Sequence, residues 1–259
     1  MLVTHSSVVM RKTPGNRMTH HAPLSSAFSG GVDSAYLLYA ARRWGRETRA
    51  YYVHSAFQPA FELADARRLA GDVGAELRVL EADVLACPAV TANPADRCYH
   101  CKQAIFSTIL AAARTDGFSV LLDGTNASDD AGDRPGMRAL RELSVRSPLR
   151  ECGLTKAEIR RLSREAGLFT WDKPAYACLA TRIPTGEVIT AEKLRRTERA
   201  EDFLFSLGFT DFRVRTLGED AKLQLRPEQL PLALEKRAEI LKFLKQDYRN
   251  VLLDLEVRG

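Results

Sequence analysis

The sequence predicts an α/β fold in which a parallel-sheet domain is followed by a smaller C-terminal α+β domain. Short apolar runs alternate with helical patterns over the first half of the chain, which is typical of the βαβ units of a parallel sheet. A loop rich in proline and small residues follows Trp171, and the order beyond it becomes helix, strand, strand, helix, strand. The 259 residues, 45% of them hydrophobic, are enough for one large or two smaller domains.

Each predicted strand is an apolar run between turn residues, and each predicted helix has apolar residues at helical spacing. Glycines mark several helix ends, and Thr155 with Glu158 predicts a capping box at one helix start. The expected elements are, in order, strand 24–28, helix 33–44, strand 49–57, helix 60–73, strand 76–84, helix 99–115, strand 119–124, helix 156–166, helix 190–207, strands 212–217 and 221–226, helix 228–246 and strand 250–256.

The change of character near residue 173 sets the expected domain boundary. Residues 1–22 are polar and without periodicity, so we expect a disordered leader there. The parallel-sheet domain is then expected over residues 23–172, and the α+β domain over residues 173–259.

The net charge of +5 and the sequence pI of about 9.0 suit anionic ligands, but the positive charge is dispersed. No block of lysine or arginine predicts a nucleic-acid arm. No apolar run reaches transmembrane length and no signal-type segment is visible, so we expect a cytoplasmic protein without a membrane or nucleic-acid partner. The odd number of cysteines, five, disfavours a disulfide framework.

The motif SGGVDS joins the first predicted strand to the first predicted helix. A strand that turns through glycines into a helix N-terminus directs free N–H groups and the positive end of the helix dipole at one spot, which makes an anion site. Asp33 beside a polyphosphate would need a cation, which predicts contact with Mg²⁺. The alternatives are an ordinary connection and, for Asp33, a helix N-terminal charge. The motif residues assigned to the phosphates are Ser29, Gly30, Gly31, Val32, Asp33 and Ser34.

The motif DGTNASDDAGDRPG follows the fourth predicted strand and carries several carboxylates. Because the carboxyl ends of parallel strands share one edge, this motif should lie opposite SGGVDS. We assign Gly124, Thr125 and Asp130 to nucleotide or Mg²⁺ binding; the alternative is a solvated acidic turn. His54 and Ser55 lie at the end of the second predicted strand, so we expect them at the same edge and assign them to nucleotide binding as well.

Three of the cysteines are candidates for metal or sulfur chemistry. Cys98 and Cys101 form a C-x-x-C pair whose thiols can face one metal or cluster, or each other; the alternative is two small residues at a helix start. Cys178 lies in the predicted interdomain loop, and a guanidinium from Arg182 would favour its thiolate; the alternative is an incidental cysteine.

Two patterns in the C-terminal part indicate binding or catalysis. Glu201 falls on a helix face otherwise formed by Leu194, Thr197 and Leu204, and a buried charge is costly unless it is paired; the alternative is a glutamate at the helix edge. The strand FRVRT places two arginine forks, from residues 213 and 215, on one face, which suits a phosphate. Here the alternative is a solvent-exposed face.

These motifs together resemble a known family. SGGVDS is similar to the pyrophosphate loop of the ATP pyrophosphatases, or PP-loop enzymes. Together with DRCYHCK, DGTNASDDAGDRPGMRALRELSVRSPL, PAYACLATRIPTGEVI and LLDLE, it resembles the LarE family from about residue 23 onward. These proteins are ATP-dependent sulfurtransferases that build the nickel-pincer nucleotide cofactor of lactate racemase. The resemblance implies a PP-loop domain of the adenine nucleotide alpha hydrolase type.

The resemblance also implies a reaction. ATP adenylates a ring carboxylate of pyridinium-3,5-biscarboxylate mononucleotide and releases pyrophosphate; a sulfur nucleophile then displaces AMP and leaves a thiocarboxylate. By resemblance Cys178 matches the cysteine of sulfur chemistry, and Arg213 and Arg215 match the arginine pair expected to hold the phosphate of the nucleotide. From their positions, we expect Arg182 and Glu201 to act in catalysis with Cys178. Implied partners are this small nucleotide, a downstream nickel-insertion enzyme and further copies of the chain in a homo-oligomer.

The sulfur source separates two types within the family. Members with one cysteine sacrifice its sulfur, whereas members with three hold a [4Fe–4S] cluster whose open iron carries a transferable sulfide. This chain has Cys98, Cys101 and Cys178 and therefore resembles the cluster type. A structural zinc, with His100 as fourth ligand, is the other alternative. Gln224 departs from the pattern, because an acidic residue is expected there in the single-cysteine type.

Three other functions remain open at this point. A PP-loop tRNA thiolase would need an RNA-binding surface that the sequence does not show. An amide synthetase of the GMP or NAD synthetase kind would leave the three cysteines without a role. A non-catalytic nucleotide or metal sensor would bind ATP without releasing pyrophosphate.

Overall fold

The computed structural model describes residues 23–43, 47–129 and 135–256. The expected leader 1–22 and the candidate Asp130 lie outside these residues. The described chain divides into two compact units. Unit 1 holds residues 23–55, 60–82 and 96–173; unit 2 holds residues 56–59, 83–95 and 174–256.

Unit 1 is built on a four-stranded parallel sheet in the order β3-β2-β1-β4. In register, Leu24 pairs with Thr48 on one side and with Val120 on the other. This confirms the parallel sheet that the alternation of strand and helix predicts. Its strands are β1 (Leu24–Ala27), β2 (Thr48–His54), β3 (Glu76–Glu81) and β4 (Val120–Leu122).

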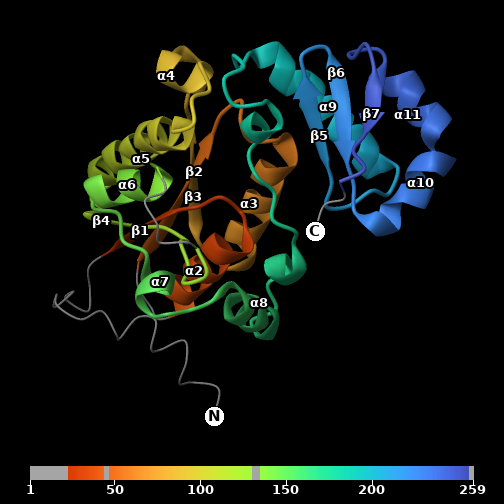
Figure 1. The fold of residues 1–259 in the computed structure, drawn as a ribbon. Helices are drawn as coiled ribbons and strands as arrows, with labels where there is room; N and C mark the ends of the chain where they lie inside the picture. The colour runs from red at the N-terminus through yellow and green to blue at the C-terminus, as the bar shows by residue number, and fades with distance from the viewer. Residues whose placement is uncertain (1–22, 44–46, 130–134, 257–259) are drawn as a thin grey trace. The chain divides into compact units, whose positions relative to one another are not determined.

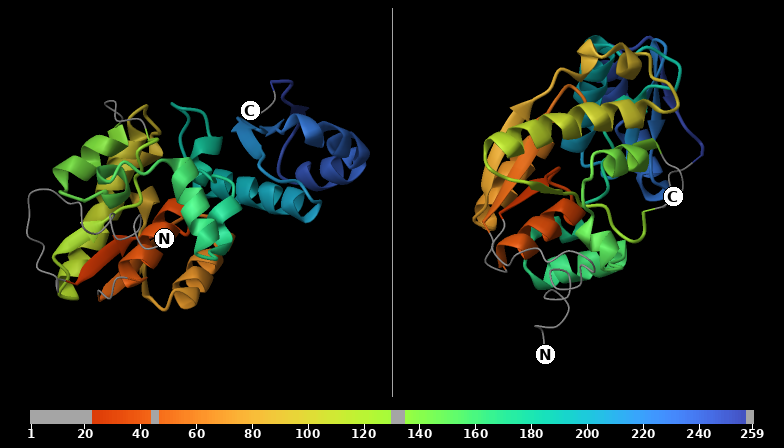
Figure 2. Two further views of the ribbon diagram at one scale, coloured as in Figure 1. Left: turned by 90° about the horizontal axis from the view of Figure 1, so that it is seen from below. Right: turned by 90° about the vertical axis from the view of Figure 1, so that its left-hand side faces the viewer.

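Helices cover both faces of this sheet, as Figure 1 and Figure 2 show. Successive strand residues point to opposite faces, so Ala50 and Tyr52 of β2 join one core while Tyr51 and Val53 join the other. The first core also takes residues of α2 (Val32–Arg43), α3 (Ala60–Asp72) and α8 (Lys156–Glu165), and the second takes residues of α5 (Arg97–Thr115) and α6 (Pro135–Glu142).

The strand order reverses at β1. The chain runs from β1 to β2 to β3 across one side of the sheet and then returns to place β4 on the other side of β1. At such a reversal the loops that follow the two neighbouring strands leave on either side of a crevice, which is where open parallel sheets bind ligands. The loops after β1 and β4 are those that carry SGGVDS and DGTNASDD.

Unit 2 packs helices against a three-stranded sheet in the order β5-β6-β7. Strands β5 and β6 are antiparallel, and β6 and β7 are parallel. Its core joins side chains of α9, such as Leu204, to side chains of the sheet, such as Val214 and Leu223. The main elements are α9 (Ala191–Ser206), β5 (Arg213–Leu217), β6 (Asp220–Gln224), α10 (Leu230–Glu235), α11 (Arg237–Leu244) and β7 (Val251–Leu253).

The α/β fold class is confirmed, and the capping box of Thr155 and Glu158 is present at the start of α8. Several boundaries differ from the prediction. The predicted strand 76–84 ends at Glu81. The Asp83 carboxylate accepts hydrogen bonds from the N–H groups of Leu85 and Ala86, and a 3₁₀ turn begins there. Strand 250–256 is reduced to Val251–Leu253.

The predicted helix 228–246 is wrong as one element. It is a 3₁₀ turn, η4 (Pro227–Gln229), followed by α10 and α11, which are separated at Lys236. Proline is tolerated only in the first turn of a helix, so Pro227 marks the start of η4 and Pro231 the start of α10. The pattern also did not predict four short elements: η1 (Val84–Ala86), α4 (Pro88–Thr91), α6 and α7 (Pro148–Glu151).

Two further 3₁₀ turns, η2 (Phe169–Asp172) and η3 (Leu179–Arg182), lie on either side of residue 173. Among the described helices, none has the length and apolar character needed to cross a membrane.

Candidate functional site

The loop after β1 requires glycine at one position. Gly30 has φ +73°, in the left-handed region, and a Cβ there would lie 3.3 Å from the carbonyl oxygen of Glu62. The loop then enters α2 directly, and the Ser34 hydroxyl donates back to the Gly31 carbonyl at 3.1 Å. The Ser29 N–H donates to the same Ser34 hydroxyl at 3.3 Å. The loop is therefore closed on itself over the first turn of α2, where the N–H groups of a helix lack internal acceptors.

The loop after β4 lies against this same helix start. A Cβ on Gly124 would come within 2.8 Å of the Ser34 backbone nitrogen. Only a glycine allows so close an approach of two backbone segments. The structure thus brings SGGVDS together with Gly124 and Thr125, as the parallel topology predicts.

Asp123 braces the loop after β4 through side-chain hydrogen bonds. Its carboxylate is buried and accepts hydrogen bonds from the Thr125 hydroxyl and, at 2.5 Å, from the Ser147 hydroxyl. Burial raises the pKa of the Asp123 carboxyl, against these two hydrogen bonds and the positive charge of Lys102, which lower it. The contacts of Asp123 are those of a brace for the loop, because Ser147 and Thr125 occupy both of its oxygens.

Asp33 has one occupied and one unoccupied oxygen. Its Oδ2 accepts from the Lys156 ammonium at 2.5 Å, and its Oδ1 is buried with no hydrogen-bond partner among the described residues. An orphaned carboxylate oxygen at a phosphate loop has the chemistry of a ligand for a hard divalent cation. The residues present therefore fit Mg²⁺ at Asp33.

Three lysines near these loops were not predicted from the sequence. Lys156 pairs with Asp33, and Lys173 donates to Asp65 at 2.7 Å and to the Gly30 carbonyl at 3.4 Å. The third, Lys102, packs over α6 and acts electrostatically on Asp123. All three are distant in sequence from SGGVDS, so no local pattern linked them to that loop.

His54 and Ser55 lie at the carboxyl end of β2, next to β1 in the sheet. The His54 ring pairs with the Glu81 carboxylate at 3.0 Å, which directs it toward the end of β3. Ser55 is buried. Both residues keep the edge position that was predicted, and their assignment to the nucleotide stays a prediction.

The C-x-x-C pair lies at the beginning of α5. Cys98 and Cys101 are separated by three positions, which places them on one helix face. Cys98 is exposed, and the guanidinium of Arg97 lies 3.8 Å from its sulfur. His100 pairs with Asp96 at 3.5 Å. Within the described part of the chain, no group of three or more His, Cys, Asp or Glu side chains is placed to hold a metal ion.

Unit 2 contains a fully buried ion pair. Arg182 and Glu201 are each 1% exposed, and two guanidinium nitrogens donate to the two carboxylate oxygens at 2.9 and 3.0 Å. The carboxylate also accepts from the Val214 N–H at 2.9 Å and from the Tyr176 hydroxyl. Burial alone would lower the pKa of Arg182, but the hydrogen bonds and charge of Glu201 outweigh burial and raise that pKa. The predicted inward face of α9 is confirmed, because Glu201 is buried and not at the helix edge.

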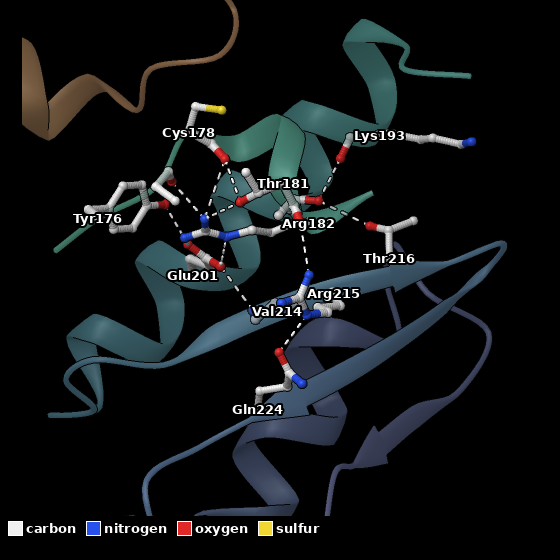
Figure 3. A network of polar contacts seen from close by, with 12 residues as sticks. Tyr176, Cys178, Thr181, Arg182, Lys193, Glu201, Val214, Arg215, Thr216 and Gln224 are labelled. Carbon is white, nitrogen blue, oxygen red and sulfur yellow. Dashed lines mark hydrogen bonds and ion pairs between the residues drawn. The ribbon is translucent and has the colours of Figure 1, made fainter. Parts of the chain in front are cut away.

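This ion pair holds the segment that carries Cys178, as Figure 3 shows. The remaining Arg182 nitrogen donates to the Ala177 carbonyl at 2.6 Å and to the Cys178 carbonyl at 3.4 Å. Thr181 donates its hydroxyl to the Cys178 carbonyl at 2.8 Å. The Cys178 thiol itself is directed away from the guanidinium, so Arg182 fixes the backbone of the cysteine and leaves its sulfur outward (Figure 3).

The two strand arginines lie on one face of β5, where they alternate with buried Val214 and Thr216. Arg215 donates to the Thr181 carbonyl at 2.8 Å and to the Gln224 amide oxygen at 2.5 Å. Arg213 pairs in register with Gln224 of β6. Through the hydrogen bond from Arg215 to Thr181, the arginine face of β5 contacts the segment that Arg182 holds.

We expect Gly124→Ala to separate the two loops of unit 1. The added Cβ would meet backbone atoms of Ser34 and Asp33, so the free energy of unfolding should fall by about 1–3 kcal/mol and ATP affinity should fall with it. Gly71→Ala is the matched control, because its Cβ would meet nothing within 4 Å. Urea unfolding and calorimetric titration with ATP measure both effects; an unchanged ATP affinity in Gly124→Ala would contradict the juxtaposition.

We expect Glu201→Gln to lower the free energy of unfolding by about 3–5 kcal/mol, because it leaves the Arg182 charge buried and uncompensated. The double variant Arg182→Met/Glu201→Leu should regain part of this loss. Glu187→Gln, which breaks the half-exposed pair with Lys193, is the control and should cost less than about 1 kcal/mol. Additive losses in the double variant, measured by urea unfolding, would refute a coupled pair.

Comparison with known proteins finds a family and several relatives of the chain. Residues 9–149, more than half of the chain, match the family described as asparagine synthase. An uncharacterized protein of Synechocystis sp. is 39% identical over 236 residues, which cover 89% of this chain and 87% of the relative.

Two other relatives align over a similar length. The pyridinium-3,5-bisthiocarboxylic acid mononucleotide synthase of Lactiplantibacillus plantarum is 32% identical over 88% of this chain and 84% of its own length. An uncharacterized protein of Methanocaldococcus jannaschii is 28% identical over 89% of this chain and 88% of its own length. The chain therefore belongs to the asparagine synthase family of ATP-utilising PP-loop proteins and, within it, to the LarE family that its motifs resemble.

Proposed function

We propose that this protein is an ATP-dependent sulfurtransferase that adenylates a ring carboxylate of pyridinium-3,5-biscarboxylate mononucleotide and replaces the carboxylate oxygen with sulfur. The observation that carries the proposal is the contact between Gly124 and the start of α2, which gathers a phosphate loop and a polar loop at one sheet edge. The relative named as the synthase of the bisthiocarboxylic acid mononucleotide supports this substrate. The product would be the thiocarboxylate nucleotide from which the nickel-pincer cofactor is built.

In the first step, a ring carboxylate oxygen attacks the α-phosphorus of ATP, the bond to the β-phosphate breaks, and pyrophosphate leaves. The N–H groups of Gly31 and of the first turn of α2 would hold the departing phosphates, which gain negative charge as they leave. Asp33 would hold Mg²⁺ through its unoccupied Oδ1. When bound, Mg²⁺ would neutralise part of the phosphate charge.

In the second step, a sulfur nucleophile attacks the carbonyl carbon of the adenylate and AMP leaves. Cys178 is the proposed cysteine of sulfur transfer, because its thiol is directed outward from a segment that is otherwise fixed. Arg182 and Glu201 bind each other and hold the backbone around Cys178, so we assign them positioning roles. The face with Arg213 and Arg215 would bind the phosphate of the nucleotide substrate.

The chain has the cysteines for the cluster type of sulfur transfer. Cys98 and Cys101 would supply two sulfur ligands from one face of α5, and Cys178 of unit 2 would supply the third. A [4Fe–4S] cluster would supply a reusable sulfide on its open iron. In the sacrificial alternative, the Cys178 sulfur forms a thioester with the substrate, its Cβ–S bond breaks by elimination, and dehydroalanine remains.

Adenylation is tested by exchange of labelled pyrophosphate into ATP. We expect exchange only when pyridinium-3,5-biscarboxylate mononucleotide is present, and a loss of at least about 100-fold in Asp33→Asn. Asp72→Asn, which removes an exposed carboxylate from another helix, is the control and should keep full exchange. Exchange that depends on tRNA or on an acceptor for ammonia chemistry would favour one of the other PP-loop functions.

The sulfur source is tested by purification without oxygen, followed by assay of iron and acid-labile sulfide. We expect about four of each per chain, lost in Cys98→Ala, Cys101→Ala and Cys178→Ala and kept in the control Cys152→Ala. No iron in the wild-type protein, together with a mass loss of one H₂S from Cys178 after a single turnover, would replace the cluster with the sacrificial mechanism.

A further inference from the structure

We propose that Lys156 is a phosphate-binding residue that Asp33 holds in the nucleotide-free protein and releases when Mg²⁺ and ATP bind. On binding, the Asp33 carboxylate would exchange the ammonium for the metal ion, and the ammonium would move to a phosphate oxygen. The inference rests on ATP binding as proposed above, and it names a residue and an exchange that the proposed reaction does not itself require.

The ion pair is formed at the place where the metal should bind. Lys156 Nζ lies 2.5 Å from Asp33 Oδ2, within the first turn of α2. The two side chains remain 34% and 22% exposed, so the pair contributes little to stability and can be exchanged without unfolding. A buried pair such as that of Arg182 and Glu201 could not be exchanged in this way.

The second observation is the unoccupied oxygen of the same carboxylate. Asp33 Oδ1 is buried and has no hydrogen-bond partner among the described residues. A buried unsatisfied acceptor is costly, and it persists where a ligand completes it. A divalent cation at Oδ1 would place a second positive charge within a few ångströms of the ammonium, and their repulsion would expel the lysine from Asp33.

The backbone of Lys156 is fixed, whereas its side chain is partly exposed. Lys156 is the first residue of α8, behind the Thr155 capping box, and its N–H donates to the Ser128 hydroxyl at 2.9 Å. Ser128 belongs to the loop after β4, so the two loops and α8 meet at this point. The four-carbon side chain of lysine can therefore swing from Asp33 to an adjacent phosphate with no change in the fold.

Charge also favours Lys156 over the neighbouring lysine. Lys173 is tied to Asp65 at 2.7 Å and to the Gly30 carbonyl at 3.4 Å, contacts that a metal at Asp33 would not break. Of these two lysines, only Lys156 is paired with the carboxylate that would bind the metal. The pair of Asp33 and Lys156 is neutral when no metal is bound. With Mg²⁺ bound, the net charge of this group becomes positive, which favours binding of polyphosphate.

The test uses Mn²⁺ and inorganic pyrophosphate as probes on the purified full chain. In Lys156→Met, Mn²⁺ alone, followed by loss of its free electron paramagnetic resonance signal, should bind about fivefold more tightly, because Asp33 has lost its competitor. Pyrophosphate with Mg²⁺, titrated by calorimetry, should bind about 10- to 100-fold more weakly, because a charge-assisted hydrogen bond is lost. Lys156→Arg should retain most of the pyrophosphate affinity.

A second variant tests the exchange from the other side. In Asp33→Asn, Lys156 has no carboxylate partner, so pyrophosphate without metal should bind more tightly than it does to the wild-type protein. Arg161→Met, which breaks an exposed pair with Glu165 on the same helix, is the control and should change neither affinity. Unaltered Mn²⁺ and pyrophosphate affinities in Lys156→Met, or a loss of both, would overturn the exchange.

These results separate the inference from the proposed function. A wild-type protein that binds neither ATP nor pyrophosphate would refute the function and with it the exchange. A wild-type protein that binds both, with a Lys156→Met variant that behaves as the Arg161→Met control, would refute the exchange alone.

Discussion

The approach of two backbone segments in unit 1 is the constraint on which the candidate nucleotide site depends. Gly124 lies against the start of α2 at a distance that admits no Cβ. The contact exists because the strand order reverses at β1, which makes β1 and β4 neighbours although they are almost a hundred residues apart. Two carboxylates near this contact differ. Both oxygens of Asp123 accept hydrogen bonds that brace the loop, whereas Asp33 has one oxygen with no hydrogen-bond partner among the described residues, which is the oxygen proposed for a ligand.

Unit 2 uses a buried charge pair where unit 1 uses a close backbone contact. Arg182 reaches the carbonyls of Ala177 and Cys178, and Glu201 fixes Arg182 while accepting from the Val214 N–H of the sheet. A buried pair of this kind is weak as a source of stability but strict in its geometry. Residues 173–178 have no regular secondary structure, and Cys178 directly precedes the short turn η3, so this pair supplies hydrogen bonds that a longer helix or a strand would provide.

The sequence was sufficient wherever the cause of a structure is local. SGGVDS, the Thr155 capping box and the inward face of α9 each lie within a few residues, and each is present in the structure. Parallel topology then predicted that the loops after β1 and β4 would meet. Lys156 and Lys173 could not be found in this way, because lysine on a helix or loop reads as a solvated side chain. Their contacts depend on long-range packing that no local pattern encodes.

Gln224 shows how one amide affects the charge of the arginine face of β5. It accepts from Arg215 at 2.5 Å and donates to the Asp254 carboxylate at 2.8 Å. Asp254 also pairs with Lys222, whose hydrogen bond lowers the pKa of that carboxyl. A glutamate at position 224 could not donate to Asp254 and would repel it. The glutamine therefore joins a cation to an anion without adding negative charge, which supports the proposal that this face binds a phosphate and not a metal ion.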